Sequence, residues 1–174
     1  MHKTSRLARC AVAAAAVLLA GSAFAEGTFL PEVGIGYGQG KHIDGTQNTL
    51  MFTGAFGYHL DNGLGARVLW MGDFDPFRNL ASNERSFDQF TGVQAVAYLP
   101  LAPKLNFMGG LGIGRTSLNI GVANLPNGVE HVTDGLVSAG LQWKFGRHYA
   151  MEVQVDYLTK TSTSNVVLLA QVPF

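Results

Sequence analysis

The chain has 174 residues, of which only 14% are charged, and its 12 basic residues equal its 12 acidic ones in number. Soluble domains average about 25% charged residues, and the absence of a basic patch argues against nucleic acid as a partner. The single cysteine, Cys10, excludes a disulfide framework and a cysteine-based metal site. Beyond residue 25 no stretch has 18 consecutive apolar residues. A chain with few charges and no spanning helix can still cross a membrane as a closed barrel.

The first 25 residues have the pattern of a secretory signal peptide. Three basic residues precede an apolar run at 11–20, and an Ala-Phe-Ala sequence ends at Ala25. We predict a helical signal peptide at 1–25, cleaved after Ala25, and a single domain at 26–174. The predicted domain keeps nine of the basic residues and all twelve acidic ones.

Apolar residues alternate with polar residues or glycine in eight segments of the predicted domain. Such alternation predicts half-buried strands, and about ten residues suffice for a tilted strand to cross the hydrocarbon core. The fourth segment is the least regular, because both of its faces carry apolar residues. We assign Gln94 to its inward face, since an amide facing lipid is costly. The segments are about 28–38, 48–60, 63–74, 89–99, 104–115, 133–145, 149–158 and 163–174.

The connections between these segments alternate in length. Short turns are predicted at 61–63, 100–103 and 145–148. Longer polar stretches lie at 39–47, 75–88, 116–131 and 159–164. Membrane barrels have short periplasmic turns and longer external loops.

Aromatic residues gather near both ends of the segments, which predicts two girdles at the membrane interfaces. The girdle expected at the periplasmic end contains Phe29, Tyr58, Phe107, Trp143, Tyr149 and Phe174. The girdle expected at the outer end contains Tyr37, Phe52, Trp70, Phe74 and Tyr157.

The last segment ends on an aromatic residue, and one of its faces is wholly apolar. That face consists of Val166, Leu168, Ala170, Val172 and Phe174. A signal-bearing chain that ends in this way resembles the last strand of a bacterial outer-membrane β-barrel. The resemblance implies that this face is the assembly signal and that the barrel-assembly machinery is a partner during biogenesis.

The chain as a whole resembles a small outer-membrane β-barrel domain of the OmpA/OmpX/opacity type. The resemblance rests on the eight-strand rhythm, the stretch 145–158 and Phe174. It implies an all-β, eight-stranded, antiparallel, up-and-down transmembrane barrel in the outer membrane of a Gram-negative bacterium. Outer-membrane lipid and lipopolysaccharide are the expected partners. We also expect a monomer with no cofactor or metal. Its external loops are the candidates for contact with a surface ligand, and ordinary solvated loops are the alternative.

Polar residues on the inward faces predict a network that fills the lumen. An eight-stranded barrel is just wide enough for side chains to fill, and buried charges must be paired. We expect Arg67 to bridge acids of neighbouring strands. A narrow polar conduit is the alternative interpretation. The predicted network contains Glu32, Arg67, Gln94, Asp134, Lys144, Glu152, Gln154 and Asp156.

The sequence shows no catalytic motif, so a structural or surface-interaction role is expected. His42, His59, His131 and His148 have no serine or cysteine at a spacing typical of a triad, which leaves neighbours in space open. Two other classes stay open: a lipid A-modifying outer-membrane enzyme, and a soluble barrel of lipocalin type. In the lipocalin type the apolar faces point inward.

Overall fold

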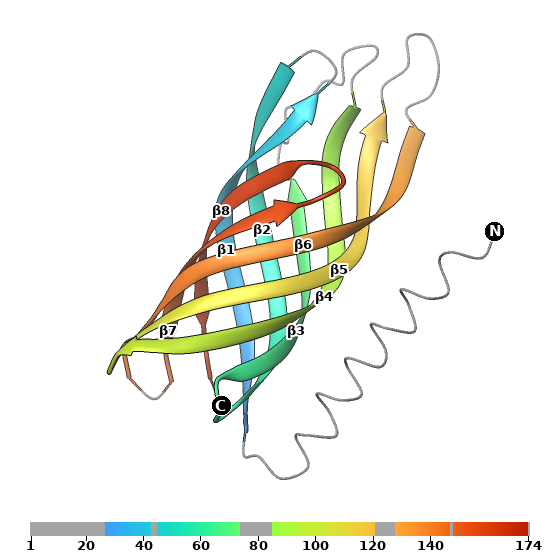
Figure 1. The fold of residues 1–174 in the computed structure, drawn as a ribbon. Coiled ribbons are helices and arrows are strands. Elements are labelled where there is room, and N and C mark those ends of the chain that lie inside the picture. The colour runs from blue at the N-terminus through green and yellow to red at the C-terminus, as the bar shows by residue number, and fades with distance from the viewer. Residues whose placement is uncertain (1–26, 43–44, 74–84, 121–127, 147, 174) are drawn as a thin grey trace, which may run out of the picture.

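A computed structural model describes residues 27–42, 45–73, 85–120, 128–146 and 148–173. The predicted signal peptide and Phe174 lie outside these residues. Each strand pairs antiparallel with the next, and β1 pairs with β8, so the eight strands close into a barrel (Figure 1). The described residues contain no helix that is long and apolar enough to span a membrane. The strands are β1 (Gly27–His42), β2 (Gly45–Leu60), β3 (Leu64–Asp73), β4 (Arg85–Ala102), β5 (Leu105–Ile120), β6 (Gly128–Lys144), β7 (Ala150–Leu158) and β8 (Thr163–Gln171).

The side chains of each strand alternate between the lumen and the outer surface. In β7 every second residue is buried, so that Glu152 and Gln154 lie inside while Val153 and Val155 are 42% and 50% exposed. Because successive residues of a strand point to opposite faces, the period of two in the sequence becomes an apolar exterior around a polar interior. The predicted all-β, eight-stranded fold is confirmed. Its apolar faces point outward, whereas in the lipocalin type they point inward.

Several strands run further than the alternation predicts at the end of the barrel that carries the longer connections, which we call the outer end. β4 begins at Arg85 and β6 at Gly128, inside the predicted loops 75–88 and 116–131. β5 and β6 stay in register as far as the pair Ile120↔Gly128. The backbone ladder continues, but the period of two does not: three consecutive residues of β5, 116–118, are buried. A register shift between Phe87 and Gln89 interrupts the alternation of β4 as well.

The tight turn between β2 and β3 depends on Gly63. Its φ of +84° lies in the left-handed region that favours glycine. Its amide donates to the Leu60 carbonyl at 3.0 Å, and its own carbonyl accepts from the Tyr98 amide at 2.7 Å. A Cβ at this position would lie 2.5 Å from the Tyr98 carbonyl oxygen, so the turn needs glycine for both reasons.

Aromatic side chains lie on the outer surface near both ends of the barrel. At the end carrying the short turns, Phe29 stacks on Phe56 with ring centroids 5.7 Å apart and also contacts Tyr58 at 4.9 Å. Trp143 and Trp70 lie on the outer surface toward opposite ends of the barrel, each 42% exposed. The predicted girdle members Phe74 and Phe174 lie outside the described residues.

The lumen contains an apolar layer that the sequence analysis does not anticipate. Seven buried residues form a cluster toward the outer end of the barrel. A second cluster, made of Val96, Tyr98 and Met108, lies nearer the short turns. The lumen is therefore filled by apolar side chains as well as by the predicted polar ones. The outer cluster comprises Met51, Leu69, Met71, Phe87, Phe90, Leu136 and Leu158.

Candidate functional site: the polar network of the lumen

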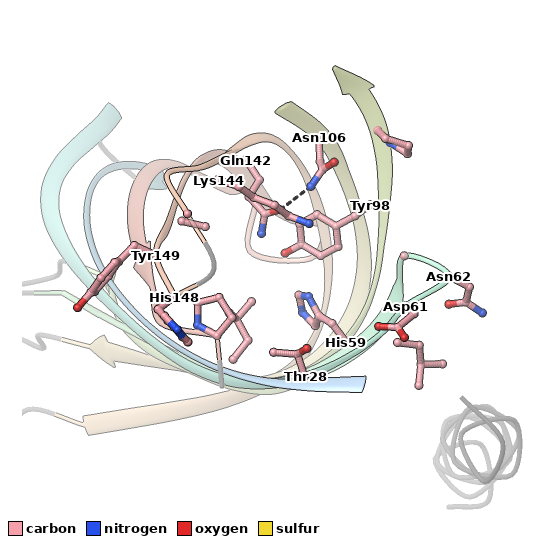
Figure 2. Close-up of a pocket in the computed structure, with 17 residues that line it drawn as sticks. Thr28, His59, Asp61, Asn62, Tyr98, Asn106, Gln142, Lys144, His148 and Tyr149 are labelled. Atoms are coloured by element: carbon pink, nitrogen blue, oxygen red, sulfur yellow. Dashed lines mark hydrogen bonds between the residues drawn. The ribbon is translucent and has the colours of Figure 1, made fainter. Parts of the chain in front are cut away.

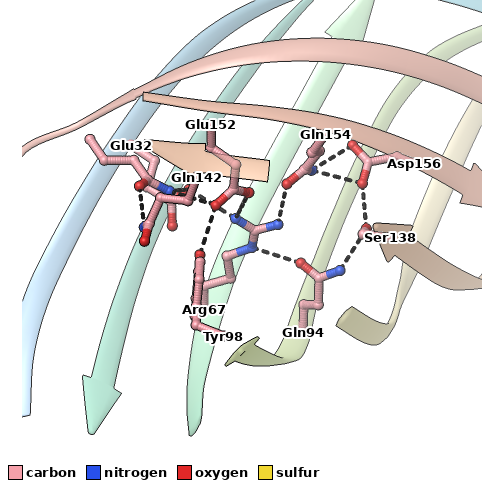
Figure 3. Close-up of polar contacts among 10 residues, drawn as sticks. Glu32, Arg67, Gln94, Tyr98, Ser138, Gln142, Glu152, Gln154 and Asp156 are labelled. Carbon is pink, nitrogen blue, oxygen red and sulfur yellow. Dashed lines mark hydrogen bonds and ion pairs between the residues drawn. The ribbon is translucent and has the colours of Figure 1, made fainter. Parts of the chain in front are cut away.

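Arg67 of β3 is the centre of the network. Its side chain is buried, and its three nitrogens contact residues of three different strands (Figure 3). Nη1 donates to Glu32 Oε2 of β1 at 2.8 Å. Nη2 donates to Gln154 Oε1 of β7 at 2.6 Å, and Nε donates to Gln94 Oε1 of β4 at 2.7 Å. One guanidinium thus connects four strands across the lumen.

A second carboxylate, that of Glu152, approaches the same nitrogen of the guanidinium as Glu32 does. Its Oε1 is 3.6 Å from Arg67 Nη1. The Tyr98 hydroxyl donates to Glu152 Oε2 at 2.9 Å. The Gln171 amide donates to both Glu152 Oε2 and Glu32 Oε2 at 3.1 Å. The two acids therefore share one cation and one amide donor, which fixes β1, β7 and β8 against one another.

Five side chains from β3, β4, β6 and β7 form a closed hydrogen-bonded ring inside the lumen. Arg67 donates to Gln94 and Gln154, which lie on either side of it. Gln94 Nε2 donates to Ser138 Oγ at 2.7 Å, and the Ser138 hydroxyl donates to Asp156. Gln154 Nε2 completes the ring by donating to both oxygens of the Asp156 carboxylate at 2.7 Å. Donors thus face every acceptor of the ring, which is what a buried polar group needs.

Glycine on β5 makes room for this ring. A Cβ on Gly110 would lie 2.5 Å from Gln94 Nε2. Glycine at this inward position therefore leaves space for the long side chain of Gln94 on the neighbouring strand.

The network contains more acids than bases. Glu32, Glu152 and Asp156 are all at least 98% buried. Among the described residues Arg67 is the only cation paired with Glu32 and Glu152, while Asp156 accepts only from the neutral Ser138 and Gln154. Glu32 Oε1 and Glu152 Oε1 are buried without a hydrogen-bond donor. Because unpaired buried charge is expensive, the stability of this arrangement depends strongly on Arg67.

The structure brings six of the eight predicted lumen residues into this network. They are Glu32, Arg67, Gln94, Glu152, Gln154 and Asp156. The prediction did not include the partners Tyr98, Ser138 and Gln171. Alternation places Ser138 on the inward face, but the contacts depend on which strands face each other across the lumen, and the sequence pattern does not contain that information.

Asp134 is buried but lies apart from the network, in the outer half of β6. Its carboxylate accepts hydrogen bonds from the backbone amides of Lys160 and Thr161 at 2.7 and 3.1 Å. The Thr161 hydroxyl also donates to it at 2.7 Å, and the Thr116 hydroxyl does so at 3.3 Å. Asp134 therefore anchors the β7–β8 turn to the barrel wall, and its placement in the lumen network is corrected.

Replacing Asp134 with Ala is expected to release the β7–β8 turn. Hydrogen bonds to a charged group are worth about 1.5–3 kcal/mol, so we expect the free energy of unfolding to fall by about 2 kcal/mol. The measurements are urea unfolding of the barrel in lipid vesicles and protease cleavage at 159–162. Thr161→Val, which removes only one donor, should have a smaller effect. Equal cleavage of D134A and the unmodified chain would contradict this role.

Lys144 is also outside the network, because it is the last residue of β6 and is exposed. It lines a cavity of about 660 Å³ at the end of the barrel that carries the short turns. Figure 2 shows His59, Tyr98 and Gln142 projecting into this mouth beside it. Lys144 has the predicted inward parity, but the strand ends there and its side chain meets solvent. The prediction that it joins the buried network is wrong.

Two polar side chains connect this cavity with the network. Asn106 Nδ2 donates to Gln142 Oε1 at 2.7 Å, and Gln142 Nε2 donates to Gln171 Oε1 at 2.7 Å. Since Gln171 donates to the two glutamates, a chain of amides runs from the mouth to the centre of the lumen.

The predicted assembly face of the last strand lies on the outer surface. Val166, Leu168 and Val172 are 51%, 45% and 43% exposed, and Ala170 is exposed too. Phe174 is outside the described residues. β8 pairs with β7 on one edge and with β1 on the other, so it is the strand that closes the barrel.

A serine and a histidine that the sequence spacing does not connect lie side by side. Ser117 Oγ is 3.0 Å from His131 Nδ1, on the facing positions of β5 and β6. The strand register, which the sequence pattern does not reveal, brings them together.

No protein-family model and no curated protein sequence matches the chain. Several solved structures are similar to it in fold. Neisserial surface protein A has a TM-score of 0.69 at 9% identity, with 86% of this chain and 99% of that chain covered. Ail, the attachment invasion locus protein of Yersinia pestis, has a TM-score of 0.66 at 18% identity and the same coverage. The N-terminal β-barrel domain of Pseudomonas aeruginosa OprF has a TM-score of 0.53 at 15% identity, covering 82% and 97%.

The chain has the fold of the small eight-stranded outer-membrane β-barrels. This agrees with the resemblance to the OmpA/OmpX/opacity type. At these identities the likeness concerns the fold.

Proposed function

We propose that the chain is an integral outer-membrane protein of a Gram-negative bacterium that acts through its outer end as a non-enzymatic structural or surface-interaction protein. The observation that carries the proposal is the parity of the strands. Large apolar side chains cover the outer surface of the barrel, while charged and amide side chains are bonded to one another inside. Water would favour the opposite arrangement, whereas lipid favours this one.

The similar solved structures support a location at the cell surface. One is described as a surface protein and another as an attachment invasion locus protein. In the proposed topology the short turns and the C-terminal strand face the periplasm, and the long connections face the exterior. The signal peptide at 1–25 provides export, and the barrel-assembly machinery recognises the apolar face that ends at Phe174.

A heat-modifiable band tests the proposed location. Cells expressing the full chain are fractionated, and the outer-membrane fraction is run on a gel with and without boiling. We expect the protein in that fraction and a shift in its migration on boiling, because a folded membrane barrel resists SDS until it is heated. Recovery as a soluble periplasmic protein whose migration does not change would overturn the proposal.

The same proposal includes a closed lumen. The ring around Arg67 and the apolar cluster at the outer end lie one behind the other along the barrel axis. Since the interior of an eight-stranded barrel is only as wide as its side chains, these two layers leave little room for solute.

We therefore expect no stepwise conductance when the purified protein is added to planar bilayers. The detergent buffer alone is the blank, and insertion is checked by recovering the heat-modifiable protein from vesicles prepared in the same way. Regular, reproducible conductance steps would instead favour the narrow channel.

A further inference from the structure

Arg115 is the only charged residue on the outward face of the strands among the side chains that the structure describes. It is exposed, and the outward residues before it on β5 are apolar or glycine, ending with Leu111 and Ile113. No described residue forms an ion pair with it. A cation on a lipid-facing surface is costly unless it reaches the interface and finds a counter-charge.

The neighbours of Arg115 in the sheet are hydrogen-bonding residues. Strand register places Thr91 of β4 and Thr133 of β6 directly beside it, and Trp70 of β3 beside Thr91. Both threonines are exposed on the same outward face. Thr91, Arg115 and Thr133 thus form a row in which Arg115 is flanked on both sides by side chains that can donate hydrogen bonds.

A second polar row lies immediately beyond the first. Gln89, Ser117 and His131 occupy facing positions of β4, β5 and β6. Trp70 Nε1 donates to Gln89 Oε1 at 3.1 Å, and Ser117 Oγ lies 3.0 Å from His131 Nδ1. We call the two rows the Arg115 patch; it consists of Gln89, Thr91, Arg115, Ser117, His131 and Thr133.

The patch lies where the apolar surface of the barrel ends. The outward residues of β5 from Leu105 to Ile113 carry no polar side chain. At about 3.3 Å per residue, this stretch is about 26 Å long, or roughly 20 Å in height for a strand tilted by about 40°. That is close to the height of the apolar band of membrane barrels, about 25 Å. Arg115 therefore follows directly after the hydrocarbon region, at the depth of the lipid headgroups.

We propose that the Arg115 patch binds a phosphate of an outer-leaflet lipid, of the lipopolysaccharide class. A guanidinium matches the geometry of a phosphate and donates to two of its oxygens. The hydroxyls of Thr91 and Thr133 and the His131 ring add donors around it, and the acyl chains of the same lipid lie on Leu111 and Ile113 below. This inference rests on the proposed membrane location, and it adds the class of lipid that the outer end of the barrel would bind.

The test uses the folded barrel in nanodiscs of zwitterionic phosphatidylcholine, with and without diphosphorylated lipid A. Backbone amide shifts measured by NMR are expected to change at Thr91, Arg115 and Thr133 when lipid A is present. Arg115→Gln is expected to weaken the apparent affinity about fivefold, because one basic residue near an anionic lipid surface contributes about 1 kcal/mol. Lys160→Gln, which removes an exposed positive charge from the β7–β8 turn, should leave the shifts unchanged.

Three outcomes would overturn the inference. The first is equal shifts in R115Q and the unmodified protein. The second is that inorganic phosphate, added to discs without lipid A, reproduces the shifts, since the patch would then bind free anions. The third is a barrel that inserts and shifts on boiling but does not respond to lipid A, which would leave the proposed function intact. A chain that fails to insert would contradict the proposed function itself.

Discussion

Replacing Arg67 with Met is expected to destabilise the barrel by about 3–5 kcal/mol, the usual cost of removing one partner of a buried ion pair. Methionine has a similar length but donates no hydrogen bond, so Glu32 and Glu152 would lose their shared cation and Gln94 and Gln154 their donor. The measurement is the urea midpoint of unfolding in lipid vesicles, followed by tryptophan fluorescence.

Two further variants show whether the effect comes from the buried charges. Lys144→Met removes a positive charge from an exposed position at the mouth of the barrel, and its effect should stay within about 0.5 kcal/mol. Adding Glu152→Gln to R67M should restore part of the lost stability, because one unpaired charge is then removed. A urea midpoint in R67M equal to that of the unmodified protein would show that Arg67 does not hold the network together.

Replacing Leu111 with Arg is expected to lower the free energy of unfolding of the membrane-inserted barrel by about 2 kcal/mol, because the cost of a charge on the lipid face rises from about 0–1 kcal/mol near the interfaces to about 2–4 kcal/mol at the bilayer midplane. Leu111 is 67% exposed on the outward face of β5, within its apolar stretch. If the barrel were surrounded by water, replacing such an exposed leucine with arginine would hardly change the free energy of unfolding. A large loss of stability therefore indicates that lipid surrounds this position. Refolding yield and urea midpoints in vesicles measure the loss.

Val129→Arg is the matched control. Val129 is also on the outward parity and is 56% exposed, but it lies near the outer end of β6, beyond the Arg115 patch. The same charge there should cost less than about 1 kcal/mol, as it does near the interface. If L111R folds as well as V129R, the outer surface of the barrel does not face lipid.

The sequence predicts the fold well because the barrel exterior and interior impose opposite polarity on alternate residues. In β7 and β8 the alternation is unbroken, and the boundaries agree within a few residues. The prediction fails where that contrast fades. Near the outer end of β5, residues on both faces of the strand are buried, so strand pairing continues without a period of two.

The site is predictable in part, for a related reason. Parity identifies inward polar residues such as Arg67 and Glu152, but it does not give their height along the axis. Asp134 and Lys144 share the inward parity, yet one lies in the outer half of β6 and the other at the opposite mouth. The search for inward residues considered polar side chains only, so the apolar Met71 and Phe90 of the outer cluster were not predicted.

Quenching of tryptophan fluorescence by brominated lipids tests the outward apolar surface most directly. The chain has only two tryptophans, Trp70 and Trp143, and both lie on the outer surface toward opposite ends of the barrel. The single-tryptophan variants W70F and W143F are refolded into vesicles whose acyl chains carry bromine at shallow or deep positions. We predict strong quenching in both variants, greater with shallow bromine, because each indole lies at an interface. Fluorescence that is unaffected by bromine at any depth would show that the apolar surface does not contact lipid, and would contradict the assignment of a membrane barrel.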